Sequence, residues 1–262
     1  MAGGGAVKVS IITAVRNGAR DIGPTLDSVN EQDYADLEHV IADGASTDDT
    51  LAVVRARGRR LGAVQSERDI GVYDAFNKGL ALATGEWIGY LGAGDRFADP
   101  GVIGRLVAAA RDPQVGAVYG DLAIVDPASG QVTRRYSSAG FSADRIRWGY
   151  MPAHPTLLVR RSVYQRFGGY DTSYRIAGDF EFVARVFGES RIGHVYLPES
   201  LVLMQDGGLS NRGLRAKWTI TKEMHRACRA NHVPSSWLRL LLRLPMKYLS
   251  ESFNAAGRSR GR

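Results

Sequence analysis

Four apolar, strand-like runs of this sequence each end in polar residues whose types suit the binding of a nucleotide. A carboxylate can accept the N–H of a nucleobase, and a glycine beside it lets a flat ligand approach closely. Asp43 has that neighbour in Gly44, and Ser46 or Thr47 would then cap a following helix whose N-terminus favours a phosphate. The polar residues at the four run ends include Asn17, Asp43, Glu67 with Asp69, and Asp95.

Asp95 is a lone acid in the stretch "WIGYLGAGDRF", beside Gly92, Ala93 and Gly94. When Mg²⁺ or Mn²⁺ is bound together with a diphosphate, the protein supplies only one or two oxygen ligands. One carboxylate in a turn of small residues is therefore sufficient to hold such a cation. Read by itself, the stretch is also typical of an ordinary β-turn. If Asp95 is the sole local acidic ligand, Gly94→Asp should leave Mn²⁺ binding in place.

An alternation of strands and helices must position these residues. Strand-like runs cover residues 7–15, 37–44, 63–67 and 86–94, and helical patterns lie between them at residues 22–29, 47–60 and 72–85. This alternation predicts right-handed βαβ crossovers and a mostly parallel sheet with helices on both faces. Ligands of such sheets bind beyond the carboxyl ends of the strands. We therefore expect the four run ends to meet at one edge.

The second half of the sequence departs from this repeat. Asp99 and Pro100 predict a helix start, with Asp99 as N-cap and Pro100 at the first helical position. Strand-like pieces follow at "GAVYGDLAIVD", "GQVTRRY" and "TLLVR", and "GDFEFVARVFG" from Gly178 predicts a helix with one apolar face. We expect these pieces to form a mixed second half that completes the same sheet.

Length and composition indicate one enzyme-sized globule. The 262 residues are 44% hydrophobic, which is enough to fill the core of a large α/β domain. Cys228 is the single cysteine, so these residues can form neither an internal disulfide nor a cysteine-based metal site. The start "MAGGG" has no basic region followed by an apolar core. We therefore expect a cytoplasmic protein.

The charge is concentrated at the C-terminal end. Residues 211–262 contain 12 Lys or Arg and 2 Asp or Glu, whereas residues 1–210 contain 22 and 25. The stretch "VPSSWLRLLLRLPMKYLSESF" is too short and too charged to span a bilayer. Its cations Arg239, Arg243 and Lys247 share one helical face, so a helix kinked at Pro245 could lie in a membrane interface or dock on the body of the protein.

The motifs together resemble the family 2 glycosyltransferases, which have the GT-A nucleotide-sugar fold, and in particular the bacterial colanic-acid, capsule and O-antigen type sugar transferases. The resemblance is collinear from about Val7 to Asn211. It is carried by "SIITAVRN", "DGASTDDT", "SERDIGVYDAFNKGLALATGEWIGYLGAGDRF", "HPTLLVRRSVYQRFGGYD", "IAGDFEFVAR" and "GGLSN".

The resemblance implies a role for each candidate residue. Asp95 matches the acid that coordinates Mn²⁺ or Mg²⁺, although Ala93 and Gly94 stand where the family usually has a further acid. Asp179 matches the general base of inverting members, with Gly178 in place of the usual preceding acid. The donor-binding residues it implies are Thr13, Asn17, Asp43, Glu67, Asp69 and Lys78, of which Lys78 is alternatively a surface lysine. His154, Asp206 and Ser210 are candidates for the acceptor site or for a closing loop, and His154 alternatively holds a loop.

We therefore expect an inverting, metal-dependent glycosyltransferase. It would move a sugar from a nucleotide-diphosphate donor, UDP-sugar being favoured, to a saccharide acceptor carried on a lipid such as a polyprenyl diphosphate. This reaction would serve surface polysaccharide biosynthesis at the cytoplasmic face of the inner membrane, with the basic C-terminal helices touching the membrane. A non-catalytic nucleotide-sugar-binding or regulatory protein, or a sugar nucleotidyltransferase, is the alternative. We expect no nucleic acid partner, because interleaved aromatic and basic recognition motifs are missing.

The expected organisation follows the same reading. It comprises a disordered N-terminus at 1–6, a GT-A domain at 7–211 with a nucleotide-binding half at 7–100 and an acceptor half at 101–211, basic amphipathic helices at 212–254 and a disordered tail at 255–262.

Overall fold

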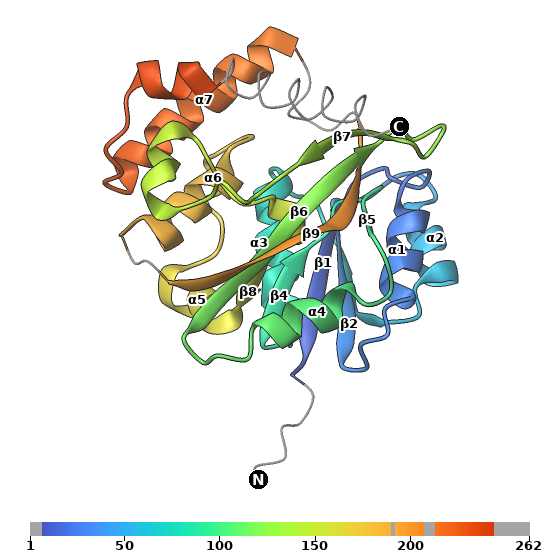
Figure 1. The fold of residues 1–262 in the computed structure, drawn as a ribbon. Coiled ribbons are helices and arrows are strands. Elements are labelled where there is room, and N and C mark those ends of the chain that lie inside the picture. The colour runs from blue at the N-terminus through green and yellow to red at the C-terminus, as the bar shows by residue number, and fades with distance from the viewer. Residues whose placement is uncertain (1–6, 190–191, 207–212, 244–262) are drawn as a thin grey trace, which may run out of the picture.

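The first half of the chain forms the predicted parallel sheet with its crossover helices. The computed structural model describes residues 7–189, 192–206 and 213–243 (Figure 1). Strands β1, β2, β3 and β4 are parallel and lie in the order β3-β2-β1-β4. Their bounds, with those of the helices between them, are β1 Val9–Val15, α1 Ile22–Asn30, β2 Leu37–Asp43, α2 Thr50–Arg57, β3 Leu61–Ser66, α3 Val72–Leu82 and β4 Trp87–Tyr90.

The second half completes the same sheet with mixed strand directions, as the sequence predicted. Strand β8 runs antiparallel to β4 and to β6, β6 runs parallel to β9, and β9 runs antiparallel to the short β5. The bounds are β5 Arg96–Phe97, α4 Val102–Ala109, β6 Val115–Val125, β7 Val132–Tyr136, β8 Leu158–Arg160, α5 Arg161–Phe167, α6 Gly178–Val183, β9 Gly193–Gln205 and α7 Gly213–Ala230. Short 3₁₀ turns cover Ala143–Trp148 and His154–Thr156, and a π-helical turn, Ala184–Glu189, extends α6.

Helices cover both faces of the sheet. Because side chains alternate along a strand, β1 sends Ile12 toward the cluster around α3 and α6. Its neighbour Ile11 belongs to the cluster around α4. At the end of the strand Val15 packs with Leu26 of α1 and Val54 of α2. Each crossover helix is thus fixed to one face, which leaves the carboxyl ends of the strands for a site.

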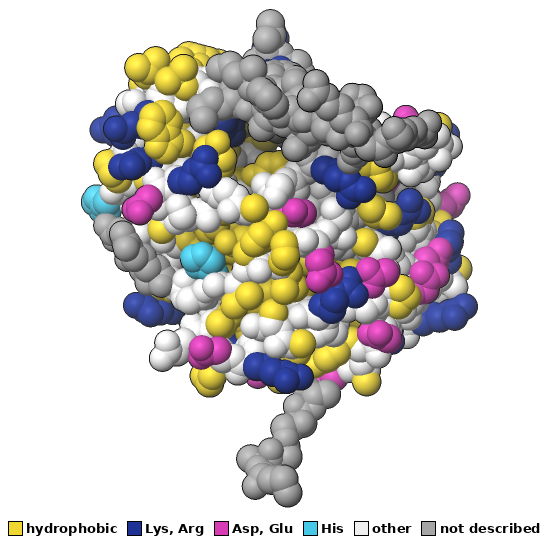
Figure 2. Space-filling view, viewed as in Figure 1, with side chains coloured by type: hydrophobic (Ala, Val, Ile, Leu, Met, Phe, Trp, Pro, Cys, Tyr) yellow, Lys and Arg dark blue, Asp and Glu magenta, His cyan; other side chains and the backbone are white. Residues whose placement is uncertain are grey.

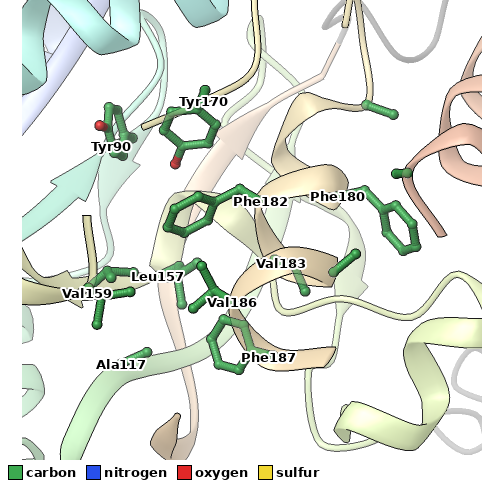
Figure 3. Close-up of a cluster of buried hydrophobic side chains, with 14 of the residues drawn as sticks. Tyr90, Ala117, Leu157, Val159, Tyr170, Phe180, Phe182, Val183, Val186 and Phe187 are labelled. Carbon is green, nitrogen blue, oxygen red and sulfur yellow. The ribbon is translucent and has the colours of Figure 1, made fainter. Parts of the chain in front are cut away.

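The largest hydrophobic cluster surrounds α6. Phe182, Val183 and Phe187 are almost completely buried, and Figure 3 shows Phe182 between Tyr170 and Leu157. The apolar face predicted for the segment from Gly178 is therefore confirmed. It anchors the helix whose first turn carries Asp179.

Two predicted helix caps are wrong. Helix α4 begins at Val102 with Gly101 at its N-cap, because Asp99 instead accepts the Gly101 N–H and pairs with Arg105. Helix α2 begins at Thr50, later than a cap at Ser46 or Thr47 would require. Ser46 binds the strand end, as described below.

The C-terminal part docks on the body of the protein as far as it is described. Residues 237–243 are helical, Leu240 is fully buried, and Arg239 lies over the Trp148 ring. Arg243 lies four residues after Arg239 in this helix, is partly buried, and has its pKa lowered by burial. Lys247, Pro245 and the two predicted disordered ends lie outside the described residues. Within the described ranges, no helix combines the length and apolar character needed to cross a membrane.

Candidate active site

Most of the predicted donor-binding residues line one surface hollow at the carboxyl ends of β2 and β3. Helix α3 forms one wall of the hollow. The turn from Glu67 to Asp69, which joins β3 to this helix, forms another part of its lining. Its lining residues are Ala42, Asp43, Gln65, Glu67, Asp69, Ala75 and Lys78. The structure therefore brings together four of the six residues predicted for the donor.

Lys78 ties that turn to α3. Its Nζ lies 3.0 Å from a carboxylate oxygen of Glu67 and 3.1 Å from one of Asp74, and it donates to the Arg68 carbonyl at 2.6 Å. Hydrogen bonding to Glu67 is the main cause that raises the pKa of Lys78. The lysine thus fixes the shape of the turn and keeps a cation at the rim of the hollow.

Asp43 is engaged in hydrogen bonds at the end of β2. It is 2% exposed, and its Oδ2 accepts the Ser46 N–H at 3.0 Å and the Ser66 hydroxyl at 2.5 Å. A Cβ on Gly44 would collide with the carboxylate of Asp69. The glycine therefore leaves room for the Asp69 carboxylate beside Asp43, so that both acids lie at the hollow.

Asn17 joins the end of β1 to the end of β2. It has a positive φ of 51°, its N–H donates to Ser46 Oγ at 2.8 Å, and its Oδ1 accepts the Thr47 N–H at 2.8 Å. Thr13 differs, because its side chain is fully buried and bonds to His39 and to the Leu91 carbonyl. Asn17 is therefore exposed at the site, whereas Thr13 supports β1 from within the sheet.

Asp95 closes a turn that two other segments hold in place. Thr25 of α1 donates to the Asp95 carbonyl at 2.7 Å and accepts the Gly94 N–H at 2.9 Å. Oδ1 of Asp95 accepts the Gln205 N–H from the end of β9 at 3.0 Å. Burial, opposed by that hydrogen bond and by one from Gly92, raises the pKa of Asp95 to about 7. Backbone N–H groups thus hold the carboxylate in position, and its described partners include no cationic side chain.

This arrangement fits a single-carboxylate metal site. No group of three or more His, Cys, Asp and Glu side chains within the described ranges is placed to hold a metal ion. A cation at Asp95 would therefore need most of its oxygen ligands from a diphosphate and water, as Mg²⁺ and Mn²⁺ allow. A Cβ on Gly92 would lie 2.8 Å from Asp95 Oδ2, so the glycine keeps the approach to that oxygen open.

The same turn places a backbone constraint on Gly94→Asp, whose effect on Mn²⁺ binding stays a prediction. Gly94 has a φ of +97°, and any Cβ there would collide with the side chain of Gln205. The residue is glycine for a backbone reason that the sequence did not reveal.

Asp179 lies in the first turn of α6, against an aromatic wall. Its Oδ1 accepts the Phe180 N–H at 2.7 Å, and the Tyr73 hydroxyl lies 3.4 Å from the same oxygen. Burial raises the pKa of Asp179, opposed by the nearby His154 and these hydrogen bonds. A carboxylate with a raised pKa is suited to take a proton.

His154 is a neighbour of this base. Its Nε2 lies 2.8 Å from the Tyr170 hydroxyl, its ring stacks on Phe76, and burial lowers its pKa. The histidine is therefore held within the aromatic cluster, close enough to Asp179 for their charges to interact. Of the other two candidates, Asp206 is exposed just after β9, and Ser210 lies outside the described residues.

Two supporting residues were missed from the sequence. Tyr73 of α3 donates its hydroxyl to the Ile176 carbonyl at 2.5 Å. Glu223 of α7 accepts the N–H groups of three consecutive residues that precede α6, at 2.8 to 2.9 Å from Arg175, Ile176 and Ala177. No local pattern signals these contacts, because they join segments 46 to 103 positions apart in the chain.

Comparisons with known proteins bear on the family and the fold of the chain. The family described as "Glycosyl transferase family 2" matches residues 10–175. A curated relative from Mycobacterium bovis, named PGL/p-HBAD biosynthesis glycosyltransferase, is 31% identical over 207 residues, which are 77% of this chain and 78% of that protein.

Two solved structures show the same fold at low identity. S. aureus TarS 1–349 in complex with UDP-GlcNAc has a TM-score of 0.69 and 17% identity, over 87% of this chain and 67% of that one. Glucosyl-3-phosphoglycerate synthase from Mycobacterium tuberculosis, in complex with Mn²⁺, UDP and phosphoglyceric acid, has a TM-score of 0.60 and 14% identity, over 84% and 78%. The chain thus has the nucleotide-sugar transferase fold that its motifs predict.

Proposed function

The chain belongs to the family 2 glycosyltransferases, and from that premise we propose that it transfers a sugar, with inversion, from a UDP-sugar to a lipid-linked saccharide. The observations that carry this proposal are the hollow with Asp43 and Asp69 at the ends of β2 and β3, the Asp95 turn after β4, and Asp179 of α6 with its raised pKa. The site of action we propose is the cytoplasmic face of the inner membrane, in surface polysaccharide biosynthesis.

Each part has one task in the proposed reaction. The hollow at β2 and β3 would hold the nucleoside, with Asn17, Asp43, Glu67 and Asp69 around it. Asp95 would hold Mn²⁺ or Mg²⁺, and such a cation offsets the negative charge that develops on the leaving diphosphate. Support for a metal and for UDP comes from the Mycobacterium tuberculosis synthase, which binds Mn²⁺ and UDP.

Asp179 would act as the general base on the acceptor. The acceptor oxygen attacks the anomeric carbon, its proton passes to the Asp179 carboxylate, and the bond from that carbon to the diphosphate oxygen breaks. Attack from the side opposite the leaving group inverts the configuration. His154 and Tyr73 would keep the carboxylate in place, because both lie close to it in the aromatic cluster.

The decisive experiment measures metal-dependent turnover of nucleotide sugars. Purified protein should release UDP from a UDP-sugar in the presence of Mn²⁺ or Mg²⁺, and a chelator should abolish the reaction. Asp95→Asn should lose the metal-dependent rate while UDP binding without metal persists. Full activity of Asp95→Asn in chelator would overturn the metal assignment, and donor binding without any turnover would favour a regulatory protein instead.

A further inference from the structure

One surface of the C-terminal region combines exposed aromatic and aliphatic side chains. Five large hydrophobic residues of α7 and of the helical residues 237–243 are 39% to 66% exposed. Trp218 and Trp237 stack at 5.6 Å, so the two helices present one continuous surface. We call this surface the α7 patch; its apolar members are Trp218, Trp237, Leu238, Leu241 and Leu242.

Cations surround the α7 patch. Lys222 and Arg229 follow Trp218 at helical spacings of four and eleven and therefore share its face of α7. Figure 2 shows hydrophobic and basic side chains beside each other in the upper left region, which α7 occupies in Figure 1. Within residues 213–243 the sequence has seven Lys or Arg and one acid, Glu223.

Glu223 does not offset this charge at the surface, because it points to the other side of α7. Its two carboxylate oxygens accept the backbone N–H groups that precede α6, the helix of Asp179. The outer face of α7 is thus apolar and cationic, whereas its inner face borders the proposed base.

We propose that the α7 patch docks the protein on an anionic lipid bilayer. Tryptophan and leucine side chains insert at the level of the lipid head groups, and each Lys or Arg near an anionic surface adds to the attraction. The charge of the patch selects this occupant, since an apolar patch that paired with itself in a dimer would bring its own cations together. The link to a lipid-linked acceptor rests on the proposed function, but the docking itself does not.

The test measures binding of the full chain to vesicles without donor or acceptor. Vesicles of phosphatidylcholine alone are compared with vesicles that contain equal parts of phosphatidylglycerol, by co-sedimentation at low and physiological salt. The protein should bind the anionic vesicles, and the affinity should fall as salt rises. Lys222→Glu combined with Arg229→Glu should weaken binding at least about tenfold, and Trp218→Ser combined with Leu238→Ser should also weaken it.

Matched controls keep the result clear. Arg55→Glu combined with Arg59→Glu makes the same charge change near α2 and should leave vesicle affinity within about twofold, because that surface carries no apolar patch. Melting temperatures are compared for all variants, and Leu242→Ser provides a second apolar variant if Trp218→Ser fails to fold. Equal vesicle binding by the wild type and both patch variants would overturn the proposal. It would also be overturned if the patch variants still bound vesicles but no longer formed a dimer that the wild type forms. Transfer to a detergent-solubilised acceptor is measured in parallel, so that a wild-type protein that turns over but does not bind anionic vesicles counts against this inference alone.

Discussion

At the scale of single residues, the site depends on two carboxylates whose surroundings raise the pKa. Asp95 is held by backbone N–H groups in a turn of small residues, and Asp179 by one N–H and a tyrosine in an aromatic cluster. Burial is the largest cause in both cases. Burial therefore favours a positive partner for each carboxylate. For Asp95 that partner would be a bound cation, and for Asp179 it would be the proton taken from the acceptor.

Asp179→Asn is expected to separate chemistry from donor binding. An amide cannot take the acceptor proton, so kcat should fall by about 10²–10⁴-fold. The affinity for UDP should stay unchanged, because Asp179 does not line the hollow. Steady-state transfer and a UDP titration measure the two quantities, and Asp171→Asn, an exposed acid in the loop before α6, is the control. Unchanged transfer would exclude Asp179 as the base.

The pH dependence of transfer has a predicted direction. The base must be ionised, and burial raises the pKa of Asp179 above its ordinary value. The rate should therefore be full at pH values above the raised pKa and fall as the pH drops through it. In a profile of kcat against pH, this acidic limb should lie above the ordinary range of an aspartate and should be absent from the residual activity of Asp179→Asn. An acidic limb at the same pH in both proteins would assign it to another group.

Gly94→Ala should destabilise the fold through its backbone. A φ of +97° is costly for a residue with a Cβ, and that atom would collide with Gln205. We expect a loss of about 1–3 kcal/mol in the free energy of unfolding, read from denaturant titration. Gly104→Ala in α4 is the matched control, because its Cβ would meet only Asp33 at 3.7 Å and should be tolerated. Equal stability of both variants would remove the backbone explanation.

At the scale of elements, α7 supports the segment that positions the proposed base. Its Glu223 accepts three N–H groups before α6, while Tyr73 of α3 binds the Ile176 carbonyl of the same segment. The segment is thus held from two helices that are far apart in the chain. Because small displacements of a catalytic group reduce the rate strongly, this support has kinetic consequences.

Glu223→Ala should lower kcat at least about tenfold with little change in the KM for the donor. The loss of charge-assisted hydrogen bonds should also reduce the free energy of unfolding by about 2–3 kcal/mol. Glu223→Gln keeps one acceptor oxygen and should recover part of kcat, whereas Lys222→Ala on the outer face should change neither quantity. A proportional loss of donor binding and kcat would indicate general damage to the fold.

At the scale of the whole molecule, local patterns were sufficient for the four parallel strands, but they missed β5 and the long strand β9 and were insufficient for the supports of the site. The four parallel strands follow from their apolar runs, and their polar ends meet because the carboxyl ends of parallel strands share an edge. Helix starts at Asp99 and Ser46 were wrong, since these side chains bind Arg105 and Asp43 instead. Glu223 could not be predicted, because its partners lie 46 to 48 residues away and are backbone groups.

A buried ionic cluster at the opposite end of the strands links several elements into one folding unit. Glu38 of β2 is 7% exposed and accepts hydrogen bonds from Ser10 of β1 and from Thr84 after α3, while Lys8 lies 2.7 Å from its Oε2. Burial acts to raise the pKa of Glu38, but the hydrogen bonds from Lys8, Ser10 and Thr84 outweigh it and lower the pKa to about 2. Because the folded state prefers the ionised form, Glu38 stabilises the protein fully above pH 4.5, the ordinary pKa, and progressively less as the pH falls toward 2.

Glu38→Gln should therefore reduce the free energy of unfolding by about 2–3 kcal/mol at neutral pH. The difference from the wild type should shrink as the pH is lowered from 4.5 toward 2, because the wild-type carboxylate is then protonated. Urea titrations at a series of pH values measure both effects. Glu86→Gln, which removes an exposed pair with Arg160, is the control and should cost less than about 1 kcal/mol. If the difference in the free energy of unfolding between Glu38→Gln and the wild type did not change with pH, the packing of the side chain, and not its charge, would account for the stabilisation.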